Sequence, residues 1–407
     1  MELGGDPITW GPMTTPATPA TTENKRFSVP AGFYWAVRSV HAGAPLFVGL
    51  GNLESLMLGR RIAGMSVDRP VYICGLPRAG TTISLQMLSE HPDVTTHKYA
   101  DFLMPYAPYA WNWIFPRVPV DAMRKPVPRI HRDRIQVTRD SAEMGEEILW
   151  ERFFPHIHDE SQRSVLDANT SNPAFERFYT EHLKKLLLSR GRKRYASKAI
   201  MCVVRMQYLR RLFPDARFLL YVRNPVDHVA SLLKQDRIWD EIDREDPRQI
   251  EIIELTGHHE FGERQIMANV GNPEVLKEIH MLRNQGRSAR ARARYWSYVY
   301  DFVLNQLASD PDLAKAVCVV RYEDLCSDSA ATIDRIITHM ELDPAPFAQT
   351  RAAYTEKLSL PDYYKPKFNT QELADIVEVT DGVAKRFGYD VAAIADRARP
   401  TPETSPA

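Results

Sequence analysis

The residues best suited to chemistry lie in the segment Gly75-Leu-Pro-Arg-Ala-Gly-Thr-Thr82. Its two glycines have the G-x-x-x-x-G spacing of a phosphate-binding loop, in which a Lys and then a Ser or Thr follow the second glycine. Here Thr81 takes the place of that Lys, and the cation of the loop, Arg78, precedes Gly80 instead. Such a loop is poorly equipped for a magnesium-bound triphosphate. It favours a compact anion that is held without a metal ion.

The flanking residues predict that this loop joins a strand to a helix. The run 70–75 places β-branched and aromatic residues between a Pro and a Gly, which is typical of a buried strand. Apolar residues at helical spacing follow over 81–91. At such a junction the unpaired N–H groups and the dipole of the helix attract an anion. The glycines let the backbone wrap closely around it.

The same strand-to-helix pattern recurs along the chain and indicates a parallel sheet. Parallel strands need helical crossovers. Further strands are predicted within 193–204, 217–222 and 317–320, and helices over 208–213, 227–234 and 330–340. The sequence therefore predicts an α/β, P-loop-like three-layer fold, with a central parallel sheet flanked by helices and with helical insertions.

A second pair of residues could bind phosphate at the same edge of the sheet. Arg223 directly follows the predicted strand 217–222, and Ser231 lies eight residues later on the next predicted helix. The planar guanidinium of an Arg matches the geometry of a phosphate group. Ligands of parallel sheets bind at the carboxyl ends of the strands. We therefore expect the pair to lie near the loop of residues 75–82.

These motifs resemble those of the sulfotransferases that use 3′-phosphoadenosine 5′-phosphosulfate (PAPS) as donor. Pro77-Arg-Ala-Gly-Thr-Thr82 is similar to their 5′-phosphosulfate loop, with Ala79 where Ser is common. His91-Pro-Asp-Val94 is similar to a segment of the bacterial-type subgroup that includes the tyrosylprotein sulfotransferases. The resemblance extends over about residues 70–390. It implies in-line transfer of a sulfuryl group from PAPS to a hydroxyl or amine acceptor, with no metal required.

The resemblance also implies roles for individual residues. Arg223 and Ser231 would hold the 3′-phosphate of the donor. Lys365, in a segment similar to a closing loop of the family, is a further candidate donor contact. Adenosine 3′,5′-bisphosphate would leave, Arg78 would stabilise the charge that develops on it, and Lys198 would neutralise the moving sulfuryl group. The loop residues that would bind the 5′-phosphosulfate are Arg78, Ala79, Gly80, Thr81 and Thr82.

The general base stays open. Where the tyrosylprotein sulfotransferases carry a Glu, this chain has Lys98, and a lysine accepts a proton only if its pKa is strongly lowered. Asp101 and His97 are the neighbouring candidates, and His has a pKa suited to proton removal near neutrality. We prefer Asp101 slightly over His97. An acidic cluster on a predicted helix is expected to be structural or on the acceptor side: Glu143, Glu146 and Glu147.

The overall composition excludes other classes of protein. Fifty-two basic residues balance 52 acidic ones, so no global field favours nucleic acid. The four cysteines form no CxxC pair, which fits a reducing compartment and gives no cysteine-based metal site. The N-terminus lacks the features of a secretory signal. The apolar stretch 42–50 is too short to span a bilayer, but it leaves a peripheral membrane contact open. We expect a cytoplasmic protein, with a homo-oligomer left open.

The chain is expected to divide into four parts. These are a flexible tail over 1–30, a helical extension over 31–66, the α/β domain over 67–396 and a disordered tail over 397–407. The acceptor is expected to be a small molecule, or a hydroxyl group of a glycan or lipid. An aromatic segment could line its site or pack the domain, and it contains Trp111, Trp113 and Phe115. The arginine run 283–294 could meet an anionic acceptor or form a solvated helix face.

Two other functions stay open at this point. A P-loop kinase, or another nucleotide-dependent phosphotransferase, would need a Lys after Gly80 and a metal-binding Asp at a strand end, and the Lys is absent. A non-catalytic protein could keep the nucleotide site and lack the base. The replacement of the family's Glu by Lys98 is the observation that favours this second alternative.

Overall fold

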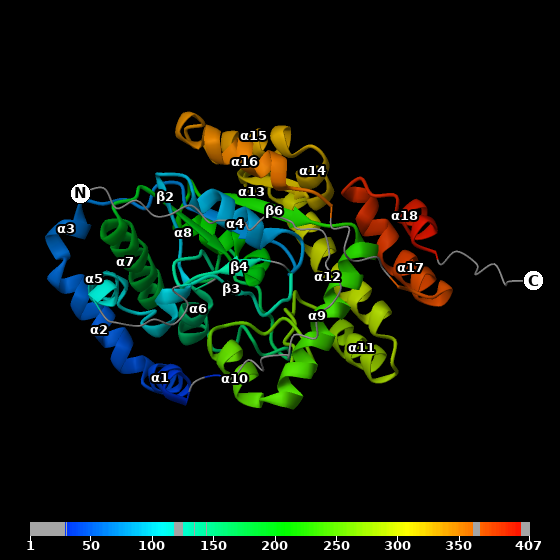
Figure 1. The fold of residues 1–407 in the computed structure, drawn as a ribbon, viewed down its shortest axis with the longest axis horizontal. Coiled ribbons are helices and arrows are strands. Elements are labelled where there is room, and N and C mark those ends of the chain that lie inside the picture. Colours follow the sequence, from blue (N-terminus) through cyan, green and yellow to red (C-terminus); the bar gives the residue numbers. More distant parts are fainter. Residues whose placement is uncertain are drawn as a thin grey trace, which may run out of the picture.

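The protein is built around a parallel sheet (Figure 1). The structure, a computed structural model, describes residue 29 and residues 31–117, 125–133, 135–143, 145–360 and 367–399. The sheet has the strand order β2-β5-β1-β6-β7, and each neighbouring pair is parallel. Its strands are β1 Val71–Cys74, β2 Val94–Thr95, β5 Arg194–Lys198, β6 Arg217–Val222 and β7 Val317–Arg321. The prediction of an α/β fold with a central parallel sheet is confirmed.

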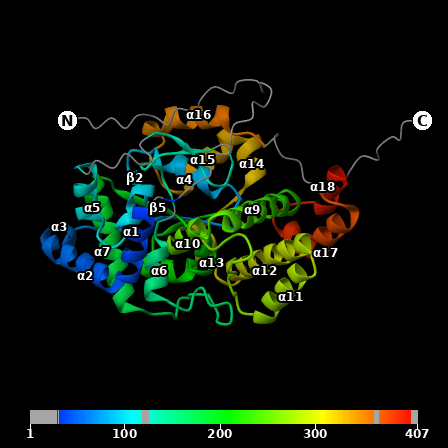
Figure 2. The ribbon, with the colours of Figure 1, turned by 60° about the horizontal axis from the view of Figure 1, so that its bottom comes forward.

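Helices cover both faces of this sheet (Figures 1 and 2). All four residues of β1 are fully buried, as expected of a central strand between two layers of helices. Tyr72 and Cys74 belong to one core, which includes residues of α7 Pro173–Arg190, α8 Met206–Leu212 and α12 Ser288–Ser309. Val71 and Ile73 belong to a second core, which includes residues of α4 Thr81–Ser89 and α15 Ser329–His339.

The observed elements follow the predicted ones closely near the long buried strands and less closely elsewhere. The predicted helix 227–234 is the start of a longer helix, α9 Pro225–Glu245. The region predicted to contain a strand over 193–204 divides into β5 and a 3-10 helix, η3 Ile200–Val204. Strand β2 and the small antiparallel hairpin of β3 Val127–Pro128 and β4 Gln136–Val137 were not predicted. Each of these strands has only two residues, too few to produce a periodic pattern.

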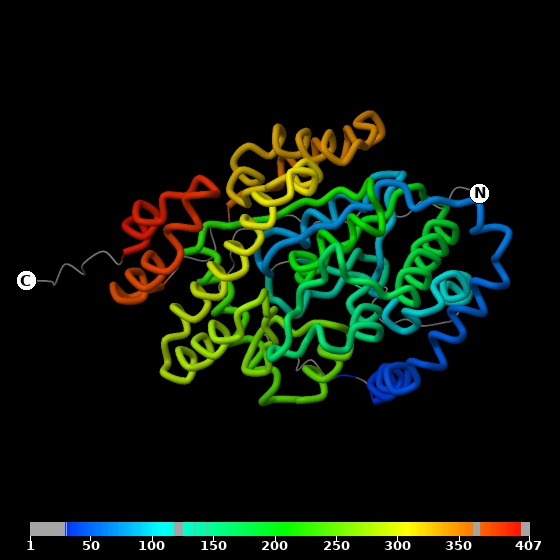
Figure 3. The backbone as a smooth tube through the Cα atoms, turned by 180° about the vertical axis from the view of Figure 1, so that it is seen from behind, coloured from blue at the N-terminus to red at the C-terminus, as the bar shows by residue number. Residues whose placement is uncertain are grey.

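The remaining helices connect or extend this framework. At the N-terminal side lie α1 Ala31–Ala42, α2 Ala44–Met57 and α3 Gly59–Ala63. Between β2 and β7 lie α5 Pro108–Ile114, α6 Glu147–Phe153, α10 Pro247–Leu255, α11 Pro273–Asn284 and α13 Pro311–Ala316. After β7 come α14 Tyr322–Ser327, α16 Ala348–Lys357, α17 Thr370–Arg386 and α18 Val391–Ala398. Seen from behind, α1–α3 lie at one end of the molecule and α17 and α18 at the other (Figure 3).

The arginine run 283–294 joins helices to one another. Arg287 and Arg290 both pair with Asp375 of α17, at 2.8 and 3.1 Å. Arg292 pairs with Asp236 of α9 and is almost fully buried. These contacts hold α12 between α9 and α17. They assign the run a structural role in place of the two alternatives expected from the sequence, an acceptor contact or a solvated face.

The N-terminal helices expose apolar side chains. The stretch 42–50 forms the start of α2, whose outward residues include Leu46, Leu53 and Met57. Among the described residues, no helix is long and apolar enough to cross a membrane. The predicted tails, residues 1–30 and 397–407, fall mostly outside the described residues.

Candidate functional site

The loop between β1 and α4 has a backbone shaped by left-handed residues. Gly75, Arg78 and Gly80 have φ values of 140°, 74° and 100°. Such angles are uncommon for a residue with a side chain, so the conformation of Arg78 must be held by its surroundings. The loop ends on the N-terminus of α4, where N–H groups lack partners within the helix. This is the geometry of an anion-binding loop.

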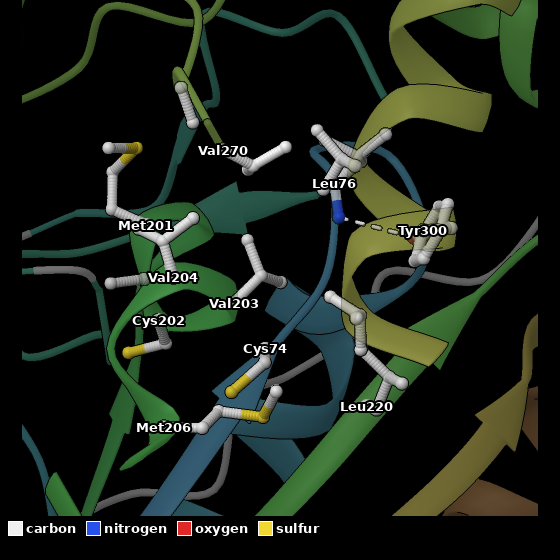
Figure 4. Close-up of a cluster of buried hydrophobic side chains, with 14 of the residues drawn as sticks. Cys74, Leu76, Met201, Cys202, Val203, Val204, Met206, Leu220, Val270 and Tyr300 are labelled. Carbon is white, nitrogen blue, oxygen red and sulfur yellow. Dashed lines mark hydrogen bonds between the residues drawn. The ribbon is translucent and has the colours of Figure 1, made fainter. Parts of the chain in front are cut away.

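Side chains of neighbouring helices hold this loop from behind. Tyr300 of α12 accepts a hydrogen bond from the backbone N–H of Leu76 at 3.2 Å (Figure 4). The same hydroxyl donates to the carbonyl of Tyr221 at 2.8 Å. His228 lies 2.7 Å from the carbonyl of Pro77 through Nε2, and its Nδ1 accepts from Trp296 at 3.1 Å. Burial lowers the pKa of His228 to about 3. The neutral ring therefore donates through Nε2 and fixes the loop backbone.

Replacing Gly75 by alanine is expected to destabilise the fold markedly. A Cβ at this position would lie 2.5 Å from the carbonyl oxygen of Tyr221, on a backbone with φ of 140°. We expect a loss of at least about 2 kcal/mol in the free energy of unfolding, measured by urea denaturation. Gly191→Ala is the matched control, because Gly191 also has a positive φ but has open space around it. There the expected loss is only about 1 kcal/mol. Equal losses in the two variants would contradict this reading of the loop.

The candidate phosphate-binding pair, Arg223 and Ser231, lies against the loop, as predicted. The Nη1 of Arg223 is 3.4 Å from the carbonyl oxygen of Arg78, and the Nε of Arg78 is 3.4 Å from the hydroxyl of Ser231. The guanidinium of Arg223 also lies over the ring of Tyr322, 4.7 Å from its centroid. Its Nε is buried without a hydrogen-bond partner in the structure. The strand ends thus bring Arg78, Arg223 and Ser231 together.

Asn224 explains why this turn is well defined. Its side chain accepts from the N–H of Asp227 and caps the start of α9, at which Pro225 occupies the first turn. Its backbone N–H and side-chain amide both donate to Glu323, at 3.0 and 2.8 Å. Glu323 in turn accepts from the hydroxyl of Tyr389 at 2.6 Å. Glu323 therefore joins the turn after β6 to Tyr389.

Lys198, at the end of β5, faces the start of α4. Its ammonium lies 3.2 Å from the hydroxyl of Thr82 and 2.6 Å from a carboxylate oxygen of Glu143. The other oxygen of Glu143 lies 3.2 Å from Arg129 and accepts from Tyr99 at 2.9 Å. Burial opposes ionisation of this carboxyl group, but Lys198 and Arg129 outweigh it and hold the pKa of Glu143 well below its ordinary value. Glu143 is therefore an anion beside the loop.

A second carboxylate, that of Asp133, forms ion pairs with two arginines at the loop. Asp133 lies 2.8 Å from Arg78 and 3.4 Å from Arg129. Burial alone would raise its pKa, but these two guanidinium groups lower it. Arg129 also donates to the hydroxyl of Thr82 at 3.4 Å. The site thus combines basic groups from four separate segments with two carboxylates.

Comparison with known proteins identifies this arrangement. Residues 70–271 match the sequence model of the sulfotransferase family. This segment runs from β1 past α10 and contains the loop, Lys198, Arg223 and Ser231. The chain belongs to the sulfotransferase family. It is therefore a transferase.

Solved structures of sulfotransferases are similar to this chain in fold. The sulfotransferase STF9 from Mycobacterium avium superposes with a TM-score of 0.53 at 14% sequence identity. The alignment covers 89% of this chain and 86% of the STF9 chain. The sulfotransferase STF1 from Mycobacterium tuberculosis H37Rv gives 0.43 at 14% identity, covering 87% and 91%. The search of curated proteins gave no match to the chain.

In this sulfotransferase, neither predicted base has a side chain directed at the loop. Asp101 forms a two-pronged ion pair with Arg190, at 2.6 and 2.9 Å, and accepts from the N–H of Lys98 at 2.8 Å. The ring of His97 is fully buried, with Nε2 2.9 Å from His182 and Nδ1 2.9 Å from the hydroxyl of Tyr195. The polar atoms of both side chains are therefore engaged by partners within the protein.

The buried His97 makes the stability of the sulfotransferase depend on pH. Burial lowers its pKa to about 4, so the folded chain binds fewer protons here than the unfolded chain between about pH 4 and 6.5. The stabilisation is complete above pH 6.5 and is lost as the pH falls. Between pH 7 and 5 we expect the free energy of unfolding to drop by about 2 kcal/mol from this group alone, measured by urea denaturation. His41→Gln, at an exposed position, should keep the same dependence. Stability that does not change between pH 7 and 5 would contradict the prediction.

Other members of the site were missed or lie outside the described residues. Lys365 belongs to the segment 361–366, which the structure does not describe. Arg129 and Asp133 were not singled out, because they lie between very short strands without a recognisable pattern. Ala79 and Thr81 are buried within the loop, where their backbone is the part available to a ligand.

Proposed function

We propose that this sulfotransferase moves the sulfuryl group of PAPS to an acceptor hydroxyl group and releases adenosine 3′,5′-bisphosphate. The observation that carries the proposal is the direct contact of two phosphate-binding elements: Arg78 of the loop touches Ser231, and Arg223 touches the loop backbone. PAPS carries phosphate groups at two ends of one adenosine. A site with two adjacent anion-binding elements fits such a donor.

The residues present suit both ends of that molecule. The loop amides and the N-terminus of α4 would take the 5′-phosphosulfate. The buried, unpartnered Nε of Arg223, together with the hydroxyl of Ser231, would take the 3′-phosphate. With Thr81 in place of the lysine of nucleotide triphosphatases, the loop supports PAPS over a magnesium-bound triphosphate.

The chemical step is an in-line displacement at sulfur. The acceptor oxygen forms a bond to sulfur while the bond from sulfur to the 5′-phosphate oxygen breaks, and its electron pair stays on the leaving phosphate. Arg78 stabilises the charge that develops there, and Lys198 neutralises the sulfuryl oxygens in transit. Positioning and charge stabilisation supply most of the catalysis in transfers of this type.

We assign the role of proton acceptor to Glu143 in preference to Asp101 and His97. The oxygens of Glu143 also have partners, but one of these is Lys198, 2.6 Å away, which faces the loop. Asp101 pairs instead with Arg190, and His97 with His182 and Tyr195. A sulfuryl group beside Lys198 would draw the charge of that ammonium away from Glu143. The pKa of the carboxyl group would then return toward its ordinary range, which makes it a better base at the moment of transfer.

The finer features of the function follow the same proposal. We infer an acceptor of small-molecule, glycan or lipid type and a bacterial-type sulfotransferase related to the tyrosylprotein subgroup. All four cysteines are free and buried, which supports a reducing, cytoplasmic setting. Trp111 donates to the carbonyl of Ala100, Phe115 is buried, and Trp113 is exposed with the guanidinium of Arg117 over its ring.

Donor binding can be tested without knowing the acceptor. Arg223→Ala should weaken the binding of adenosine 3′,5′-bisphosphate by about 10–100-fold in calorimetry, since a charged hydrogen bond is worth about 1.5–3 kcal/mol. Binding of adenosine 5′-monophosphate, which lacks the 3′-phosphate, should change little. Arg217→Ala is the matched control. Arg217 begins β6, whereas Arg223 follows its end, and Arg217 pairs with Glu341. If both nucleotides lose affinity equally, Arg223 does not read the 3′-phosphate.

A further inference from the structure

A group of metal-ligating side chains lies outside the site described above. Glu151 of α6, His158 of the following loop and His259 after α10 point their ligand atoms toward one another. The Nε2 atoms of His158 and His259 lie 3.2 and 2.9 Å from the same oxygen, Oε1 of Glu151. All three ligand atoms fall within 4.8 Å of one another.

These distances match the edges of a coordination shell. Zinc binds His nitrogen and carboxylate oxygen at about 2.0–2.2 Å in tetrahedral geometry, which places neighbouring ligand atoms about 3.3 Å apart. Two imidazoles and one carboxylate with a fourth position left open is a common zinc ligand set. Both rings converge on a single carboxylate oxygen, so a shared cation is a natural partner for all three groups.

The charges around the group also favour a cation. Glu147 contributes an oxygen 3.0 Å from the Nε2 of His158, and its other contacts are to Arg205. Glu260 lines the same pocket, and its Oε2 is buried without a hydrogen-bond partner in the structure. Arg292 lines the pocket as well, but its guanidinium is paired with Asp236. Arg205 and Arg292 are thus paired with Glu147 and Asp236, and the carboxylates of Glu151 and Glu260 exceed the arginine charge near the group.

The position of the group in the fold suggests what an ion would do there. His158 and His259 line a pocket whose wall includes Met201 and Leu76 of the loop between β1 and α4, and Figure 4 labels these last two residues. An ion bound by both histidines would join the loop after α6 to the loop after α10. It would thereby brace the side of the pocket next to the phosphate loop.

We propose that Glu151, His158 and His259 form a binding site for one divalent cation of the zinc class, with an open coordination position facing this pocket. The site is separate from Lys198 and Glu143. Its role is to hold two loops against α6, and the sulfuryl transfer needs no metal. The sequence did not reveal it, because His259 lies far along the chain from Glu151 and His158, and none of the ligands is a cysteine.

Zinc binding to the full-length protein tests this directly. After dialysis against a chelator, calorimetry with zinc chloride should give one ion per chain, and zinc should raise the temperature of unfolding. His259→Ala should lower the zinc affinity by at least about 100-fold, since even residues behind the ligands cost about 10–100-fold. His280→Ala is the matched control, because His280 pairs with Glu160 away from the group and should leave the affinity unchanged.

Two results would overturn the proposal. One is no saturable zinc binding by the unaltered chain. The other is equal zinc affinity of His259→Ala and the unaltered chain. Binding of adenosine 3′,5′-bisphosphate reports whether His259→Ala is folded. If that variant does not bind the nucleotide, Glu151→Gln takes its place, since it keeps the shape of the side chain and its hydrogen bonds but removes the charge of the ligand.

Discussion

Glu143→Gln is expected to lower the rate of sulfuryl transfer by about 10²–10⁴-fold, the usual contribution of a general base. Glutamine has the size of glutamate and can still accept from Lys198, but it cannot take the proton of the acceptor. The affinity for adenosine 3′,5′-bisphosphate should stay within about tenfold, because Glu143 touches Lys198 and not the phosphate-binding pair. Single-turnover rates with labelled donor measure the first quantity and calorimetry the second.

Asp101→Asn is the matched control for the choice of base. Its ion pair with Arg190 and its contact with Lys98 predict lower stability and a transfer rate close to that of the unaltered protein. The opposite result, in which Asp101→Asn abolishes transfer and Glu143→Gln does not, would return the role of base to Asp101. Equal rates in both variants and the unaltered protein would exclude both carboxylates.

Arg78→Ala is expected to lower the transfer rate by about 10²–10³-fold, the cost of removing one donor that meets charge developed in the transition state. Alanine and arginine are equally disfavoured by a backbone φ of 74°, so the substitution should not change the conformation of the loop. Arg78→Lys keeps the charge and loses the planar pair of donors. Its transfer rate should lie between those of Arg78→Ala and the unaltered protein. The rate at saturating donor is the measurement.

A neighbouring arginine supplies the control for Arg78. Arg132 is exposed and pairs with Glu241, so Arg132→Ala should transfer at the rate of the unaltered protein. Arg78 also neutralises Asp133, and a stability measurement on Arg78→Ala separates that contribution from catalysis. A normal rate at saturating donor with weakened donor binding would mean that Arg78 binds the ground state and does not assist departure of the phosphate.

The placement of the loop of residues 75–82 and of the pair Arg223 and Ser231 could be predicted because each is local in sequence. The loop, its glycines and Arg78 lie within eight residues between one strand and one helix, and Arg223 and Ser231 have the same relation to the next strand. Each unit carries its own periodic pattern and turn residues. Because parallel strands place their carboxyl ends at one edge, the two units had to meet there.

The base that we propose, Glu143, could not be predicted by the same reasoning. The segment that carries His97 does reach the site, but its contribution is a backbone carbonyl that accepts from the N–H of Glu143 at 3.0 Å. The carboxylate comes from the opposing segment, which pairs with it through the single bridge of Lys98 and Ala142. One isolated pair leaves no periodic pattern in the sequence. Glu143 was therefore noticed only as a member of an acidic cluster.

The arginine run illustrates the complementary error. Five arginines on neighbouring helical turns predict either a solvated face or an anionic partner when the rest of the chain is not placed. The partners of Arg287, Arg290 and Arg292 include Asp236 and Asp375. These lie tens of residues away and become neighbours only through the packing of α9, α12 and α17. Arg129 and Asp133 also find partners that are distant in sequence. They lie between the two-residue strands β3 and β4 and contact Thr82 and Arg78 of the loop.

The most direct test of the central claim compares two donors in one assay. The purified protein is offered PAPS labelled with ³⁵S in the presence of EDTA, and ATP labelled with ³²P on the γ-phosphate in the presence of Mg²⁺. The same panel of phenols, sterols, sugars, hydroxy lipids and tyrosine peptides is present in both. We expect ³⁵S in an acceptor without metal and no ³²P transfer. Transfer of ³²P, or tight binding of PAPS with no ³⁵S in any acceptor, would contradict the assignment.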